Sequence, residues 1–173
     1  MSQTAQVEAT QLEIGDPRYP QLNWLYDLWQ ERRGHRSMPA RSEIGPAELK
    51  EVLPRVMIVD VTYEPLEFRY RLSGTAISTI HGQDFTGLSV RDLQPKIYSD
   101  LIWRHYCEVL ERQVPTIYEV SLLNDFTRRH YARIILPLSA KGDRVDKLLV
   151  VDEHRGSLSE FFRDYRPLYG TGR

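Results

Sequence analysis

Few of the chemically capable side chains in this chain are spaced as a reactive or metal-binding centre would require. The single cysteine excludes an intramolecular disulfide and a cysteine-based zinc site, and the five histidines lack the short spacing of metal ligands. The sequence has no Gly-x-Ser-x-Gly elbow, phosphate-binding loop, His-Glu-x-x-His motif or dinucleotide fingerprint. One arrangement could still be reactive, a His81 base oriented by Asp84 in a glycine-punctuated region. We therefore predict a protein without catalytic activity, with a small lyase, isomerase or hydrolase as the alternative.

A basic cluster is the second group with possible chemistry. Its members are Arg32, Arg33, His35, Arg36 and Arg41. Such a cluster could meet a phosphate, a nucleotide or an acidic partner, but cations at the end of a helix and in a solvated loop explain it more simply. The net charge of −1 supplies no wider field for nucleic acid, so we expect no nucleic-acid partner.

Length and composition indicate one domain. The 173 residues, 41 % of them hydrophobic, suffice for one core. We expect a flexible amino terminus over residues 1–17, one domain over residues 18–155, and a carboxyl-terminal extension over residues 156–173 with a short helix and a frayed end. No apolar run is long enough to span a membrane and no signal peptide is evident, so we expect a cytoplasmic protein.

Three helices are predicted from hydrophobic spacing and from glycine and proline signals. The first covers residues 20–33 and carries Trp24 and Trp29, which we expect to form an association surface, with Trp29 inside the core as an equally good alternative. A shorter helix is indicated at residues 46–53. A long amphipathic helix covers residues 95–112.

Five strands are predicted, and short turn signals between them favour antiparallel hairpins. They lie at residues 56–63, 66–72, 116–123, 130–138 and 145–151. Strict alternation in the second strand places Phe68, Tyr70 and Leu72 on one face, which we expect to cover an apolar interior.

The order of these elements, together with several short motifs, resembles a PAS domain. The likeness covers residues 19–151, and it is strongest to stand-alone bacterial PAS-type proteins, common in alphaproteobacteria, that were long catalogued as a domain of unknown function. The matching segments are Trp29, Arg33-Gly34-His35-Arg36, Pro39-Ala40-Arg41, Leu49-Lys50, Leu53-Pro54, Phe68-Arg69-Tyr70-Arg71-Leu72-Ser73-Gly74-Thr75, Gly82-Gln83-Asp84-Phe85-Thr86-Gly87 and Arg133-Ile134-Ile135-Leu136-Pro137-Leu138-Ser139.

The resemblance implies an α+β fold: a five-stranded antiparallel sheet, a long helix and short helices on one face, and here an extra amino-terminal helix. In many PAS domains a small molecule lies between the sheet and the long helix. The candidates to line such a cavity are Tyr70, Leu72, His81, Trp103, Tyr106, Ile134 and Leu136. Each could equally be core packing, and the polar tips of Tyr70, His81 and Tyr106 make these three the better candidates.

Two cofactors known from PAS domains can be tested against the residues. Haem often takes its iron ligand from a histidine on the long helix, which His105 could supply, but we favour a partly exposed histidine bonded to solvent or to an acid. Flavin photosensors carry a reactive cysteine in an Asn-Cys-Arg motif after the first hairpin, whereas Cys107 lies in the long helix. We expect Cys107 to be an inert, half-packed thiol, no flavin photochemistry and no metal site; the cofactor, if any, is unknown.

The resemblance therefore implies a sensory or regulatory module that signals by association. We expect an unidentified small molecule, a regulatory protein or a second copy of the chain as the binding partner.

Overall fold

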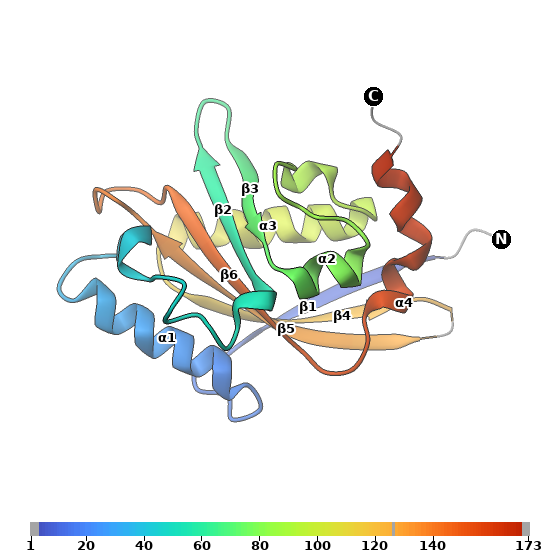
Figure 1. The fold of residues 1–173 in the computed structure, drawn as a ribbon, viewed down its shortest axis with the longest axis horizontal. Coiled ribbons are helices and arrows are strands. Elements are labelled where there is room, and N and C mark those ends of the chain that lie inside the picture. The colour runs from blue at the N-terminus through green and yellow to red at the C-terminus, as the bar shows by residue number, and fades with distance from the viewer. Residues whose placement is uncertain (1–3, 126, 171–173) are drawn as a thin grey trace.

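A curved antiparallel sheet forms the centre of the molecule, with helices on both of its faces (Figure 1). This computed structural model describes residues 4–125 and 127–170. The strands are β1 (Gln6–Leu12), β2 (Val56–Thr62), β3 (Glu67–Ser73), β4 (Thr116–Leu123), β5 (Arg128–Leu138) and β6 (Lys147–His154). The helices are α1 (Pro20–Arg33), α2 (Thr75–His81), α3 (Lys96–Arg112) and α4 (Ser159–Phe162), joined by the 3₁₀ segments η1 (Arg41–Glu43), η2 (Leu53–Arg55), η3 (Val90–Asp92) and η4 (Arg163–Gly170). The sheet order is β1-β4-β5-β6-β2-β3, which confirms the α+β prediction with one strand more than expected.

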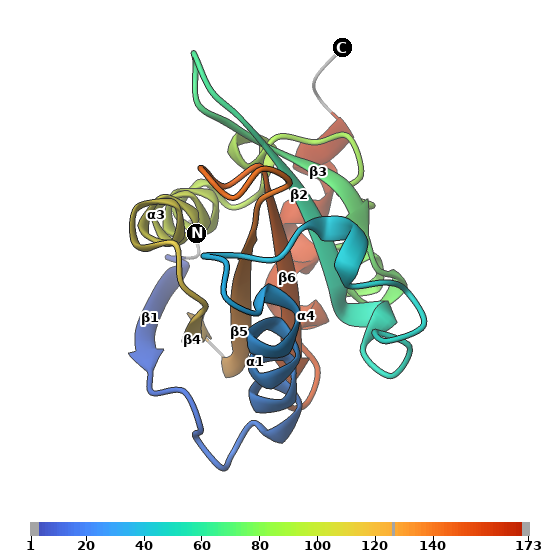
Figure 2. The same cartoon turned by 90° about the vertical axis from the view of Figure 1, so that its left-hand side faces the viewer.

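Different helices cover the two faces of the sheet (Figure 2). On β5, Arg133 points toward α3, where its Nη2 donates to the hydroxyl of Tyr98 at 3.2 Å. Successive residues of a strand point to opposite sides, so Ile134 faces the side that α1 covers. We call the side under α3 the inner face and the side under α1 the outer face.

Helix α3 has the amphipathic form predicted for it. The residues Tyr98, Ile102, Tyr106 and Val109 recur at intervals of three or four and are all buried against the inner face. The helix ends at Gln113, which is left-handed and donates its backbone N–H to the carbonyl of Val109 at 2.8 Å. The expected boundaries of residues 95–112 are correct to within one residue.

Helix α1 packs its apolar side on the outer face. It begins at Pro20, where a missing N–H is harmless, and buries Leu22, Leu25 and Trp29. The indole Nε1 of Trp29 donates to the carbonyl oxygen of Pro137 on β5 at 2.8 Å. This bond anchors α1 to the middle of the sheet.

The prediction of a flexible amino terminus is wrong for β1, which pairs along its whole length with β4. Only Val7, Ala9 and Gln11 of β1 share the inner face, so a mostly polar sequence can still form this edge strand. Backbone hydrogen bonds with β4 stabilise it despite its low hydrophobicity. Residues 1–3 of that prediction lie outside the described residues.

The short helix predicted at residues 46–53 is also wrong. This segment forms successive turns that end in η2. The backbone N–H groups of Glu48 and Leu49 both donate to the carbonyl of Gly45, and Pro54 has no N–H for a further helical hydrogen bond. These bonds are too few to nucleate an α-helix.

At the carboxyl end, the predicted short helix is present as α4, but the chain does not fray directly after it. The segment η4 continues to Gly170, and the hydroxyl of Tyr169 accepts from the backbone N–H of Gln94 at 2.9 Å. Residues 171–173 lie outside the described residues. The packed extension thus belongs to the fold.

Two glycines permit close approaches around α2. A Cβ on Gly74 would lie 2.3 Å from the carbonyl oxygen of Pro54, and one on Gly82, where φ is +66°, would lie 2.5 Å from the side chain of Arg166. The first contact brings η2 against the start of α2, and the second brings η4 against its end. No helix among the described residues is both long and apolar enough to cross a membrane.

Candidate functional site

A buried ion pair lies at the centre of the inner face. Arg133 on β5 and Asp152 on β6 are directly opposite in register, and both are at most 2 % exposed. Arg133 donates from Nε and Nη2 to the two carboxylate oxygens at 2.6 and 2.9 Å. This fork holds the pKa of Asp152 well below its usual range, although burial alone would raise it. The pair is therefore ionised.

Two tyrosines extend this ion pair toward α3, and two more form a separate hydrogen-bonded pair between the sheet and α3. The hydroxyls of Tyr98 and Tyr131 lie 3.1 Å apart, and those of Tyr70 and Tyr106 lie 3.2 Å apart. Burial raises the pKa of Tyr106 to about 12, and it raises the pKa of Tyr70 and Tyr131 as well, so all three stay protonated at neutral pH. Each hydroxyl pair links a strand to α3.

His81, at the end of α2, closes one side of the network. The centroid of its ring lies 4.6 Å from the ring centroid of Phe85, 5.6 Å from that of Tyr98 and 4.0 Å from that of Phe162 on α4. Burial lowers the pKa of His81 to about 3, so the imidazole is neutral at pH 7. Its Nδ1 is buried and, within the described chain, has no hydrogen-bond partner.

The predicted pairing of His81 with Asp84 is not formed. The Asp84 carboxylate instead accepts from the backbone N–H of Thr86 at 2.9 Å, in a turn exposed to solvent. This bond lowers the pKa of Asp84. Among the described residues, no hydrogen bond joins the two side chains, so Asp84 does not orient the imidazole.

Four of the seven predicted cavity residues come together and three do not. Tyr70, His81 and Tyr106 share the inner face, and Trp103 joins them through an edge contact with the ring of Phe68 at 4.8 Å. Leu72, Ile134 and Leu136 lie elsewhere. Whether the first four bind a ligand stays a prediction.

A β-bulge explains the position of Leu72. The register passes from Leu72 opposite Ile58 to Tyr70 opposite Val59, which leaves Arg71 as an extra residue. The alternation is reset there, so Leu72 leaves the face of Tyr70 and is 40 % exposed. The prediction that it shares that face is wrong.

The prediction that Ile134 and Leu136 line a cavity under α3 is wrong. Because Arg133 points to α3, both point to the outer face and pack under α1. An unbroken apolar run of residues leaves this choice open in the sequence.

His105 is not the partly exposed histidine that we expected. It is only 5 % exposed and its ring is stacked on that of Tyr118, with the centroids 3.6 Å apart. Burial lowers its pKa to about 3. A stacked tyrosine occupies one side of the imidazole, and this packing does not resemble an open axial position for haem iron.

Cys107 does not match a flavin-reactive thiol. It lies on α3 rather than after the first hairpin, and it is half-buried. Burial raises the pKa of its thiol, which disfavours the reactive thiolate. Among the described residues, no three His, Cys, Asp or Glu side chains group as metal ligands do.

The two tryptophans of α1 have different environments. Trp29 is 2 % exposed and belongs to the core, so the prediction that it forms an association surface is wrong. Trp24 is 42 % exposed and stays a candidate.

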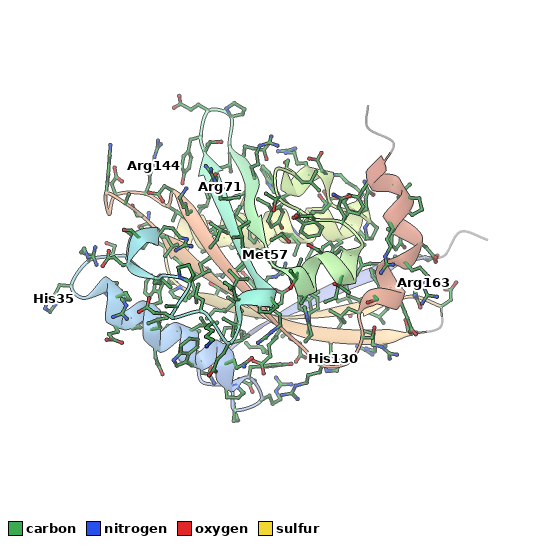
Figure 3. The ribbon with its side chains drawn as sticks, in the orientation of Figure 1. His35, Met57, Arg71, His130, Arg144 and Arg163 are labelled. Atoms are coloured by element: carbon green, nitrogen blue, oxygen red, sulfur yellow. The ribbon has the colours of Figure 1, made fainter. Side chains whose placement is uncertain are left out.

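Two of the five members of the basic cluster pair with carboxylates within the chain. Arg32 pairs with Glu48, and Arg36 forms a two-bond ion pair with Glu43 at 2.6 Å. Arg41 donates to the carbonyl of Ile44, and His35 lies at the tip beyond α1 (Figure 3). The simpler explanation, cations at the end of a helix and in a solvated loop, fits these residues. Arg33 differs, because it bonds only to neutral acceptors among the described residues.

Sequence reasoning missed several members of the network, above all Arg133 and Asp152. A signal was present: Arg133 directly precedes an apolar run on β5, Asp152 directly follows one on β6, and the two charges are opposite. Nothing local in the sequence indicates that Phe162 reaches His81.

Several solved structures and one family model are similar to this chain. One similar solved structure concerns a light-oxygen-voltage domain studied with a flavin analogue, at 20% identity and a TM-score of 0.46, covering 69% of this chain and 88% of that one. Another is an RNA-binding light-oxygen-voltage receptor, at 12% identity and a TM-score of 0.45, covering 98% of this chain but only 42% of the receptor. Both likenesses are too distant to carry an argument about function, and comparison with curated proteins gave no match. A family model described as a PAS domain matches residues 18–151, so this chain belongs to the PAS domain family.

Proposed function

We propose that this chain is a regulatory PAS module of the cytoplasm that signals by protein association and carries out no catalysis. PAS domains are generally sensory and regulatory, and the inner face supports this role here. The observation that carries the proposal is that the polar groups of the inner face bond to one another in two groups, Arg133 with Asp152, Tyr98 and Tyr131, and Tyr70 with Tyr106. Groups engaged in this way hold a conformation rather than act on a substrate.

The alternative of a small cavity enzyme has less support, because burial lowers the pKa of His81 to about 3 and leaves a weak base. Both oxygens of the Asp152 carboxylate accept from Arg133, and the neutral imidazole of His81 lies among three aromatic rings. An enzyme site needs convergent titratable groups that remain available to a substrate.

An exposed apolar surface suits association. We define the Trp24 face as Trp24, Pro46, Leu53, Pro54 and Leu72. Trp24, Leu53 and Leu72 are each at least 40 % exposed, and a hollow of about 340 Å³ is lined by Leu53, Leu72 and the two prolines. A second hollow is lined by Trp24 and Val52, and Val52 is the neighbour of Leu53 in the chain.

A second copy of the chain is the occupant that this face fits. In a twofold-symmetric pair, a protruding group and a hollow on the same face can cover each other twice. Trp24 supplies the protruding ring, and the Leu53–Leu72 hollow supplies its receptor. We therefore propose a homodimer in which each Trp24 covers the hollow of the other copy.

Light scattering coupled to size-exclusion chromatography tests this proposal. We expect twice the mass of one chain for the wild type, and a single-chain mass for Trp24→Glu and for Leu72→Glu. Ile97→Glu is the matched control, because Ile97 is 45 % exposed on α3, away from this face. A monomeric wild type, or a dimer that survives both substitutions, would contradict the proposed interface.

Four buried side-chain nitrogens lack a hydrogen-bond partner among the described residues. Two of them, Nη1 of Arg133 and Nδ1 of His81, favour a second function, the binding of a small polar ligand inside. We propose Tyr70, His81, Trp103 and Tyr106 as lining residues for such a ligand. Native mass spectrometry of fresh protein should then show a bound small molecule that His81→Phe loses and His105→Phe retains; the bare protein mass in the wild type would refute this.

A further inference from the structure

A surface hollow beside α1 carries two arginines that form no ion pair with a carboxylate among the described residues. It has a volume of about 500 Å³ and lies between α1, the turn after α3 and the segment after β1. Figure 2 shows these three segments on the side that faces the viewer. Its walls include Ile14, Tyr26, Arg33, Arg112 and Val114. We call it the Arg33–Arg112 hollow.

Both arginines of this hollow bond only to neutral acceptors among the described residues. Arg33 donates from Nε to the amide oxygen of Gln30 at 2.5 Å and from Nη1 to the carbonyl of Arg36 at 3.0 Å. Arg112 donates to the amide oxygen of Gln11 at 3.1 Å. The neighbouring Arg32 and Arg36, in contrast, each pair with a carboxylate.

None of the side chains that line the hollow is acidic. The acids nearest in sequence to its walls, Glu13, Asp27, Glu31 and Glu111, are not among them. Two guanidinium groups therefore give the hollow a local charge of +2 in a chain whose net charge is −1. Uncompensated guanidinium forks favour a carboxylate or a phosphate group, which they can bind with two bonds each.

The remaining walls are suited to an apolar body. Ile14 and Val114 are 38 % and 49 % exposed, and Tyr26 is partly buried with its hydroxyl bonded to Gln30. A volume of about 500 Å³ is in the range of small-molecule sites. Two arginines in a confined hollow do not provide the extended basic surface that a nucleic acid requires.

We propose that the Arg33–Arg112 hollow binds a small organic anion, with the carboxylate or phosphate group between the arginines and an apolar body against Tyr26, Ile14 and Val114. This site is separate from the interior under α3. It does not depend on the association proposed above, because the Trp24 face contributes none of its residues.

Calorimetric titration with phenyl phosphate tests the site, with phenol as the neutral analogue. We expect saturable binding of phenyl phosphate and at least about tenfold weaker binding of phenol, because phenol lacks the charged group. Arg33→Gln and Arg112→Gln should each weaken phenyl phosphate about tenfold or more. Arg71→Gln is the control, because Arg71 lies on β3 and pairs with Asp60 (Figure 3).

A substitution that adds a charge tests the position independently. Val114→Asp places a carboxylate beside the arginines and should abolish binding, whereas Ile97→Asp, at a similarly exposed site on α3, should not. Both sites are exposed, so folding is retained, and circular dichroism verifies it. The proposal is overturned if phenyl phosphate shows no saturation up to about 10 mM, or if Arg33→Gln and Arg112→Gln together leave its affinity unchanged.

Discussion

The inner and outer faces of the sheet differ in the kind of side chain that they bury. Under α3, the inner face carries an ion pair, four bonded tyrosines and a neutral histidine. Under α1, the outer face presents aliphatic side chains such as Ile134 and Leu136, and the indole of Trp29 reaches only a backbone carbonyl. Adjacent residues of the same strand, Arg133 and Ile134, therefore belong to two different environments.

This difference predicts how each face responds to change. An aliphatic face depends on shape, so a lost side chain leaves a cavity whose effect is local. A bonded polar face depends on complementary partners, so a lost group leaves another group buried without compensation. A regulatory module can use the second kind of face, because a change in one bond alters the preferred arrangement of the others.

The largest effect is expected at the ion pair. Arg133→Met would leave the Asp152 carboxylate buried without its partner, and should lower the free energy of unfolding by about 4 kcal/mol. Urea denaturation followed by circular dichroism measures this. The double variant Arg133→Met with Asp152→Leu should recover a large part of the loss, because no charge remains buried. A double variant as unstable as the single one would show that the pair is not coupled.

A matched truncation on the outer face should act through packing alone. Leu136→Ala is expected to lower the free energy of unfolding by about 3 kcal/mol, because Leu136 is fully buried beneath α1. The same denaturation experiment applies. Unlike the ion pair, this loss should be insensitive to pH, and a strong pH dependence would remove the contrast between the faces.

The sequence predicts those parts of the fold that local patterns specify. The spacing of Tyr98, Ile102 and Tyr106 defines α3, and turn signals define the hairpins of β4, β5 and β6. The strand β1 escaped prediction because its pairing with β4 is made by backbone groups across more than 100 residues of chain. Local composition does not report such a contact.

The candidate site was harder to predict because it depends on register and on distant segments. The single extra residue at Arg71 reversed the side on which Leu72 lies, and the position of Arg133 decides which way Ile134 points. Phe162, which lies near the carboxyl end of the chain, packs its ring against His81. Alternation within one strand can assign two faces, but it cannot say which helix covers each.

The pH dependence of stability should come from the two buried histidines. Burial lowers the pKa of His81 and of His105 to about 3, below the value of about 6.5 in an unfolded chain. Between these values the unfolded state binds more protons, so stability decreases as the pH falls, by about 1.4 kcal/mol per pH unit for each histidine. Denaturation at several pH values from about 6.5 to 5 measures this slope. His81→Phe or His105→Phe should each reduce the slope by about 1.4 kcal/mol per pH unit, the contribution of one bound proton. The exposed His35→Gln should not, and an unchanged slope in both phenylalanine variants would contradict this assignment.

The smallest effect expected separates the two tyrosine pairs of the inner face. Tyr70→Phe leaves the buried hydroxyl of Tyr106 without its partner, whereas Tyr131→Phe leaves that of Tyr98 still accepting from Arg133. Losing one neutral hydrogen bond costs about 1 kcal/mol, and an unsatisfied buried hydroxyl adds to that, so Tyr70→Phe should be the more destabilising of the two. Denaturation of both variants side by side supplies the measurement, since the substitutions remove the same atom. Equal losses would mean that the bond from Arg133 does not compensate Tyr98, and the Tyr98–Tyr131 pair would then behave like the separate Tyr70–Tyr106 pair.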